Sequence, residues 1–187
     1  MLSEMFDESI EDSLHYGGYE WEGASPYNIT FDEVIDGDTL LMLAVRIDKL
    51  RAAVPQYFPD RKKWKFTASH NTGKAPAAVD GNAGSRFDTG TAMVPGMWFT
   101  IQLPKAAEVS GLQLDSVASP MDYPDGYEVR LSSDGKAWSK PVAKGHGNGP
   151  VTEIYFKGVP ARFIRVIQTG RRPGKFWSIH ELQVYGK

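Results

Sequence analysis

The sequence contains no cysteine among its 187 residues. A chain without thiols can form no disulfide bond, no thiolate metal site and no cysteine nucleophile. The absence says little about the cellular compartment, because a domain of this length can bury enough apolar surface to be stable without disulfide bonds.

Long hydrophobic runs are also missing. No stretch of eighteen consecutive apolar residues occurs, so the sequence predicts no membrane-spanning helix. The first twelve residues are acidic and lack the basic and then apolar pattern of a secretory signal peptide. A processed precursor, a fragment of a longer protein and an intracellular protein would all begin in this way.

Positive charge is absent from the first quarter of the chain. Residues 1–45 carry eleven acidic side chains and neither lysine nor arginine, and the first basic side chain is Arg46. The remainder holds all 21 lysines and arginines with twelve of the 23 acids, a net charge of about +9. Such an acidic segment is typical of a solvated leader, but it can equally dock on the basic body or on a partner.

The sequence of the N-terminal third of the chain indicates an extension that precedes a domain, rather than a strand-rich domain of its own. Residues 1–37 indicate an irregular acidic arm, whose aromatic side chains argue against a wholly solvated tail. Residues 38–54 predict a helix, because apolar residues recur at helical spacing between a capping Asp38 and the terminating Pro55. We assign residues 38–63 to this helix and a linker.

From Trp64 onward the pattern changes to short runs in which polar and aliphatic side chains alternate, as on half-buried antiparallel strands. Tight turns such as Ser133-Asp134-Gly135 separate these runs. The runs that predict strands are 98–103, 109–114, 127–131, 151–156, 161–167 and 179–185. Six or more short strands with intervening turns indicate an all-β sandwich or barrel over residues 64–187.

Six short motifs follow one another in this part of the chain. They are Trp64 with Thr67-Ala68-Ser69, Ala78-Val79-Asp80-Gly81-Asn82 with Ser85-Arg86-Phe87, and the segments 95–103, 127–138, 161–166 and 178–186. Each motif alone is weak, but in this order, over about 120 residues, they resemble the discoidin or coagulation factor 5/8 type C family. That family includes the carbohydrate-binding modules of family 32. The resemblance does not extend to residues 1–63.

The resemblance implies a discoidin-like jelly-roll β-sandwich of about eight antiparallel strands, with ligands bound by loops at one end. We expect Ser133-Asp134-Gly135 to close a hairpin whose next strand begins at Trp138. Tryptophans in such strands are more often core residues than ligand platforms, so we expect Trp98 and Trp138 in the core. We expect Arg162 and Arg165 to lie on the solvated face of their strand.

The implied function is non-catalytic binding, with a carbohydrate or glycan as the first candidate ligand. The alternative is a protein-interaction or assembly module whose acidic arm docks on a partner or on a larger parent protein. Catalysis is disfavoured, because the sequence shows no Ser-His-Asp arrangement, phosphate-binding glycine-rich loop or histidine-rich metal set. No basic helix or aromatic–basic stripe predicts nucleic-acid binding. We expect an extracellular, periplasmic or cell-surface location.

Many relatives hold a structural Ca²⁺ in the loop that corresponds to residues 78–85. The resemblance carries this role to the positions Ala78, Asp80, Asn82, Ser85 and Glu181. Such a set suits Ca²⁺, which prefers roughly six to eight oxygen ligands from carbonyls as well as carboxylates. The alternative is that Asp80 caps its own turn and that Glu181 pairs with a nearby arginine.

The ligand residues of sugar-binding relatives are only partly present. Their Trp-His pair corresponds to Phe87-Asp88 here, and the arginine that precedes their tyrosine-rich strand is missing from residues 121–126. The usual galactose-binding set therefore does not transfer.

The chain's own loops predict a ligand site of cations, aromatic platforms and carboxylates, which together can bind the hydroxyls and the apolar face of a sugar. The predicted ligand residues are Asp88, Tyr123, Arg171, Arg172, Phe176 and Trp177. As alternatives, the last two aromatic residues can pack against neighbouring loops, and the two arginines can belong to a solvated turn. His70 and His180 are expected to be structural histidines.

Overall fold

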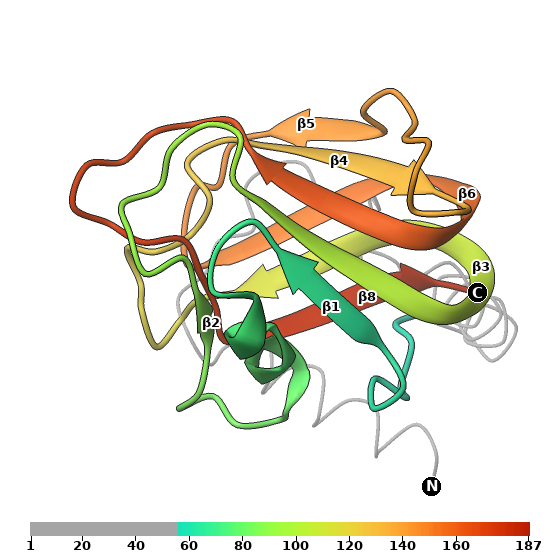
Figure 1. The fold of residues 1–187 in the computed structure, drawn as a ribbon, viewed down its shortest axis with the longest axis horizontal. Helices are drawn as coiled ribbons and strands as arrows, with labels where there is room; N and C mark the ends of the chain where they lie inside the picture. Colours follow the sequence, from blue (N-terminus) through green and yellow to red (C-terminus); the bar gives the residue numbers. More distant parts are fainter. Residues whose placement is uncertain (1–55) are drawn as a thin grey trace, which may run out of the picture. The chain divides into compact units, whose positions relative to one another are not determined.

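The computed structural model of this chain describes residues 56–187, which form one 3₁₀ helix and eight strands (Figure 1). In chain order the elements are β1 (Lys65–Ala68), η1 (Thr72–Val79), β2 (Phe87–Asp88), β3 (Trp98–Asp115), β4 (Tyr127–Ser132), β5 (Ala143–Gly145), β6 (Val151–Gln168), β7 (Ser178–Ile179) and β8 (Glu181–Gly186). Every pair of neighbouring strands is antiparallel. The expected antiparallel β-sandwich is confirmed.

The two longest strands, β3 and β6, each run through both layers of the sandwich. They pair along most of their length, but register shifts interrupt the pairing between Gln102 and Ala107 and between Val109 and Gly111. Such bulges bend a strand and increase its twist. The first half of β3 pairs with β1 and the second half with β8, and Figure 1 shows β3 curling around one end of the sandwich between these halves.

Bending explains why fewer, longer strands are present than the sequence pattern indicates. The separate strands expected at 98–103 and 109–114 are the two halves of β3, and those at 151–156 and 161–167 are the two halves of β6. A bulge interrupts the alternation of side chains without ending the strand. The sequence pattern alone therefore predicts the end of a strand at the bulge.

A single hydrophobic core fills the space between the layers. Alternate residues of each strand point into it, among them Phe99 of β3, Ile164 of β6 and Leu182 of β8, all fully buried. Phe87 of β2 packs edge-on against the ring of Trp177, with 6.3 Å between the ring centroids. The short β2–β7 pair is therefore anchored to the core by aromatic packing as well as by its hydrogen bonds.

The last strand is flanked by residues that precede the first one. Tyr57 forms an antiparallel bridge with Tyr185, and the Gly186 N–H donates to the Gln56 carbonyl at 2.7 Å. The described part of the expected linker thus lies along β8. The expected acidic arm of residues 1–37 and the expected helix of residues 38–54 lie outside the described residues.

Two tryptophans that we expected in the core lie on the outer face of the sheet instead. Trp98 precedes the buried Phe99, so strand alternation turns its side chain outward, and it is only partly buried. Trp138 is also partly buried, and the ring centroids of both lie 4.3 and 4.1 Å from the guanidinium carbon of Arg165. The strand expected to start at Trp138 starts at Ala143, so the β4–β5 loop is longer than predicted.

Candidate functional site

Four loops gather at one end of the sandwich, where residues 89–97, 116–126, 146–150 and 169–177 connect the strands (Figure 1). We call this end the rim. The fully buried side chain of Gln168, at the end of β6, accepts hydrogen bonds from the N–H groups of Gly126 and Gly170 at 3.0 and 3.2 Å. One buried amide therefore ties two rim loops to the sheet.

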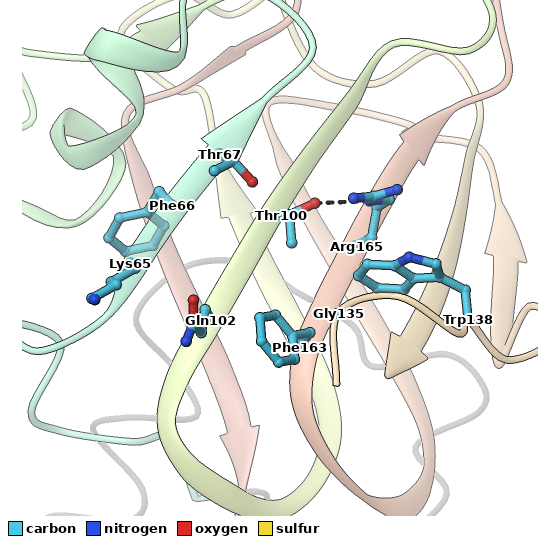
Figure 2. A pocket seen from close by; sticks show the side chains of 9 residues that line it. All are labelled: Lys65, Phe66, Thr67, Thr100, Gln102, Gly135, Trp138, Phe163 and Arg165. Atoms are coloured by element: carbon cyan, nitrogen blue, oxygen red, sulfur yellow. Dashed lines mark hydrogen bonds between the residues drawn. The ribbon is translucent and has the colours of Figure 1, made fainter. Parts of the chain in front are cut away.

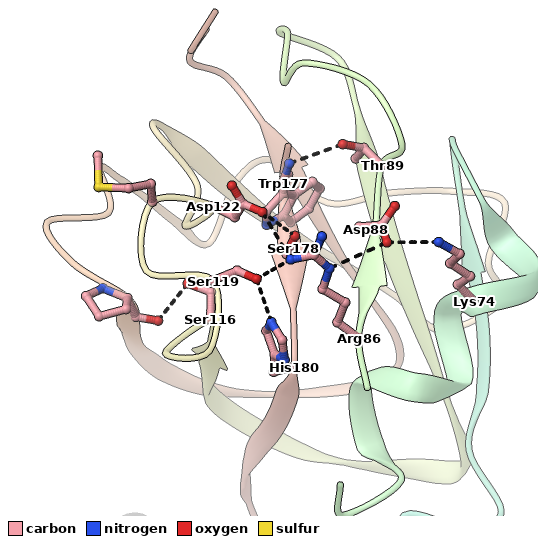
Figure 3. Close-up of polar contacts among 12 residues, drawn as sticks. Lys74, Arg86, Asp88, Thr89, Ser116, Ser119, Asp122, Trp177, Ser178 and His180 are labelled. Carbon is pink, nitrogen blue, oxygen red and sulfur yellow. Dashed lines mark hydrogen bonds and ion pairs between the residues drawn. The ribbon is translucent and has the colours of Figure 1, made fainter. Parts of the chain in front are cut away.

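The guanidinium of Arg86 joins the rim loop 116–126 to strand β2 (Figure 3). Its Nη1 donates to the Ser119 hydroxyl and lies 3.5 Å from a carboxylate oxygen of Asp122. Its Nε lies 3.6 Å from the carboxylate of Asp88. The Ser178 hydroxyl donates to the same oxygen of Asp122 at 2.8 Å. The sequence signal for Arg86 is its place in the Ser85-Arg86-Phe87 motif, and we had given it no role of its own.

Asp88 is held by its own chain. Its side chain lies 3.0 Å from the Lys74 ammonium group and accepts a hydrogen bond from the Asn71 amide at 3.3 Å, and the residue is only 6% exposed. Burial alone would raise the pKa of the Asp88 carboxyl, but the hydrogen bond and charge of Lys74, with the charge of Arg86, outweigh it and lower the pKa. Asp88 is thus a charged anchor beneath the rim.

His180 also has a structural role in this network. Its Nδ1 lies 2.8 Å from the Ala83 carbonyl, which can only accept, so Nδ1 carries a proton; in the neutral ring Nε2 then accepts from the Ser119 hydroxyl at 2.9 Å. In a catalytic triad a carboxylate would stand where this carbonyl stands. The Ser119–His180 contact therefore links two parts of the chain, and it lacks the carboxylate that would complete a hydrolytic triad.

A second group of charged residues lies at the outer side of the rim, and we call it the arginine cluster: Tyr123, Asp125, Arg171 and Arg172. The guanidinium carbon of Arg172 lies 4.2 Å from the centroid of the Tyr123 ring. Its Nη2 lies 3.2 Å from the Asp125 carboxylate, and its Nη1 donates to the Met121 carbonyl at 3.0 Å. Arg171 is exposed, and Met121 is 50% exposed.

The structure brings some of the predicted ligand residues together and separates others. Tyr123, Arg171 and Arg172 lie in the arginine cluster, whereas Asp88 belongs to the Arg86 network. Phe176 is half-buried.

The structure corrects the assignment of Trp177. It is fully buried, and both its backbone N–H and carbonyl bond to Thr89, so its ring packs inside the domain and offers no platform to a ligand. Its indole N–H has no hydrogen-bond partner among residues 56–187.

The residues predicted to bind calcium also come together. The Gly81 N–H donates to one carboxylate oxygen of Glu181 at 2.7 Å, so the loop that follows η1 meets the start of β8. The Asp80 carboxylate accepts hydrogen bonds from the Ser85 hydroxyl at 2.6 Å and from the Asn82 N–H at 2.9 Å. These bonds, that of Ser85 above all, hold the pKa of Asp80 below its usual value. Ala78, at the end of η1, is fully buried.

An arginine already supplies positive charge at this place. Arg61 Nη1 lies 2.6 Å from the second carboxylate oxygen of Glu181 and donates to the Leu182 carbonyl at 2.9 Å. Within the described range no three His, Cys, Asp or Glu side chains gather closely enough to hold a metal ion. The calcium site stays a prediction, and an ion there would compete with Arg61 for the Glu181 carboxylate.

The bent sandwich with a loop-bearing rim defines a galactose-binding-like β-sandwich. The family model of the F5/8 type C domain matches residues 64–182, and this chain belongs to that family. Within residues 56–187 no helix has the length and hydrophobicity needed to cross a lipid bilayer.

Known proteins are similar to about two thirds of this chain. A galactose oxidase of Gibberella zeae is 29% identical over 136 residues, which are 67% of this chain but only 20% of that protein. Chitosan-binding module 2 from a Paenibacillus chitosanase/glucanase, solved with chitotriose, is 28% identical at a TM-score of 0.55, over 65% of this chain and 95% of the module. A family 32 module of Clostridium perfringens NanJ, solved with galactose, shares the fold at 24% identity and a TM-score of 0.60, over 71% and 99% of the two chains.

Proposed function

We propose that this domain is a non-catalytic carbohydrate-binding module whose ligand contacts the rim. The observation that carries the proposal is the arginine cluster, in which a guanidinium is fixed on a tyrosine ring beside a partly exposed carboxylate. Tyr123 and Asp125 hold Arg172 from two directions, so its remaining N–H groups are oriented before a ligand arrives.

Sugar hydroxyls match this combination of groups. A hydroxyl can donate to the Asp125 carboxylate and accept from an arginine, so two neighbouring hydroxyls can bridge the pair. The exposed side chain of Met121 offers an apolar contact to the C–H face of a sugar ring. Arg171, exposed beside Arg172, adds a second cation at the same edge.

The similar proteins support a carbohydrate as the ligand class. The Paenibacillus module was solved with chitotriose and the Clostridium perfringens module with galactose. The galactose-binding pattern itself is altered here, because Phe87-Asp88 replaces the Trp-His pair and Asp88 is paired with Lys74 and Arg86. We therefore expect the rim to differ from those modules in the sugar that it selects.

Two features favour binding without catalysis. The Ser119–His180 contact ends on the Ala83 carbonyl instead of a carboxylate, so no negative charge stands behind the ring to stabilise the imidazolium that a general base becomes. Asp122 and Asp88, the carboxylates closest to it in the network, are both neutralised by Arg86.

The test is affinity electrophoresis against a panel of soluble polysaccharides, followed by titration calorimetry with the best ligand. We expect the wild-type chain to be retarded by at least one neutral or amino-sugar polymer. Arg172→Ala should weaken binding about tenfold or more, because a pre-oriented charged hydrogen-bond donor is lost.

Lys157→Ala is the matched control, since Lys157 is an exposed cation in the bend of β6, far from the rim. The proposal fails if no polysaccharide retards the wild-type chain, or if both variants bind as it does.

A further inference from the structure

A pocket of about 150 Å³ lies on the outer face of the sheet, away from the rim (Figure 2). The floor of the pocket is formed by side chains of β1, β3 and β6 that face outward. Their neighbours along the same strands face the core: Phe66 packs toward it, and Ile101 and Ile164 are buried in it. None of the arginine-cluster residues lines this pocket.

Pairing between the three strands arranges the floor in two rows. Thr67, Thr100 and Arg165 stand opposite one another in the first row, and Lys65, Gln102 and Phe163 in the second. Directly paired side chains on one face of a sheet lie close enough to act on the same ligand. The floor therefore presents hydroxyl, amide and cationic groups side by side.

Arg165 is the most constrained of these side chains. Its guanidinium carbon lies 4.3 Å from the Trp98 ring centroid and 4.1 Å from that of Trp138. The two rings stack on the guanidinium, and its edge with the two terminal nitrogens has no hydrogen-bond partner among residues 56–187. The Nε donates to the Thr100 hydroxyl at 2.8 Å, which fixes the orientation of that edge (Figure 2).

The positive charge of Arg165 has no counter-ion in the described part of the chain. No acidic side chain of residues 56–187 lies within 4.0 Å of its nitrogens, and the terminal nitrogens donate no hydrogen bond within that range. Its partner in register on β4 is Arg130, which is occupied by Glu128. Partial burial lowers the pKa of Arg165, as expected for a cation that lacks an anion.

The β4–β5 loop closes one side of the pocket. Gly135 has a φ of +76°, and a Cβ there would lie 3.0 Å from the Phe163 ring, so glycine lets the loop rest on that ring without strain or crowding. This contact places Trp138, from the same loop, over Arg165.

We propose that this pocket binds the carboxylate of an acidic sugar unit, such as a uronic acid, against the open edge of Arg165. A guanidinium fork and a carboxylate form two parallel hydrogen bonds in one plane, and the stacked tryptophans leave those N–H groups unused. Lys65 adds a second positive charge, and Thr67 and Gln102 can bond to the sugar hydroxyls. This site is independent of the rim.

The test uses the full chain in affinity electrophoresis with polygalacturonate, and with galactan as the neutral polymer. We expect polygalacturonate to retard the chain and Lys65→Glu to weaken that binding about tenfold or more. Lys63→Glu is the charge-matched control, because Lys63 is exposed and lies outside the pocket, and it should retain binding. Gln102→Leu, which keeps every charge, should weaken binding as well.

Equal losses in Lys65→Glu and Lys63→Glu would reveal non-specific attraction to a polyanion and overturn the proposal. Competition by free galacturonic acid separates a single acidic sugar from a polymer as the ligand, and both outcomes support the site. Competition by a polyglutamate peptide with the same strength would overturn the assignment to sugars. Arg172→Ala should bind polygalacturonate normally, so a failed rim proposal leaves this test intact.

Discussion

The rim contains two clusters of the same residue types that use their hydrogen-bonding capacity differently. Around Arg86, the carboxylates of Asp88 and Asp122 are bonded to lysine, arginine and serine of the same chain. In the arginine cluster, the side chain of Asp125 is 37% exposed, against 8% for Asp88 and 14% for Asp122, and Arg171 beside it is exposed. Arginine and aspartate alone therefore do not predict a ligand site, and the proposed rim site is based on hydrogen-bonding groups that are unused and accessible.

The largest expected effect is on the core that carries both clusters. Trp177→Ala removes a fully buried ring from its contact with Phe87 and should lower the free energy of unfolding by roughly 3–5 kcal/mol. Urea unfolding followed by fluorescence measures the change. A loss of sugar binding with unchanged stability would instead return Trp177 to the ligand site.

Breaking the buried cluster should have the next largest effect. Asp88→Asn removes a charge that Lys74 and Arg86 surround, and should cost roughly 1–3 kcal/mol at neutral pH. Because the folded-state pKa of Asp88 is lowered, its contribution is present above the unfolded pKa of about 3.9 and is lost as the pH falls through the folded value.

Thermal unfolding across the acidic range should therefore show a steeper loss of stability for the wild type than for Asp88→Asn. Parallel curves would mean that the ion pairs around Asp88 do not couple to folding.

The Arg61–Glu181 pair lies between the two extremes, with about a fifth of each side chain exposed. Arg61→Gln should cost up to about 1 kcal/mol without calcium. If Glu181 is a calcium ligand, removing its present partner should also increase the rise in melting temperature on adding Ca²⁺. Lys62→Gln, at an exposed neighbouring position, is the control, and equal responses of both variants would contradict a competition at Glu181.

The smallest expected effect on stability is at the arginine cluster. Arg172→Ala should change the free energy of unfolding by about 0.5 kcal/mol, because its ion pair with Asp125 is partly solvated. The same variant should show the largest loss of rim binding, so the two clusters separate stability from recognition. A large destabilisation by Arg172→Ala would remove this distinction.

The sequence is sufficient for the family and for the antiparallel strands, because alternation and turn residues are local signals. It is not sufficient to predict which of the aromatic rings near loops are buried. Trp138 lies outside the core because the β4–β5 loop is longer than the Ser-Asp-Gly turn indicates, and Trp177 is buried because β2 and β7 pair.

Contacts between segments far apart in the sequence were also not predicted. Arg61 meets Glu181 across 120 positions of sequence, and Arg86 meets Ser119 across 33. No periodic pattern encodes such pairs, because only the bent course of β3 and β6 brings the segments together. The pairing of Glu181 with an arginine was one of the alternatives, but the sequence did not say which arginine.

The pairing of residue 56 with residue 186 has a practical consequence for experiments on binding. β8 starts beside the rim loops and runs away from them, so the two ends of the described domain emerge together on the side remote from the rim. A surface tether or fluorescent label attached at Lys187 would leave all four loops open to solution. Immobilisation through the C-terminus is therefore the orientation in which weak glycan binding at the rim is easiest to measure.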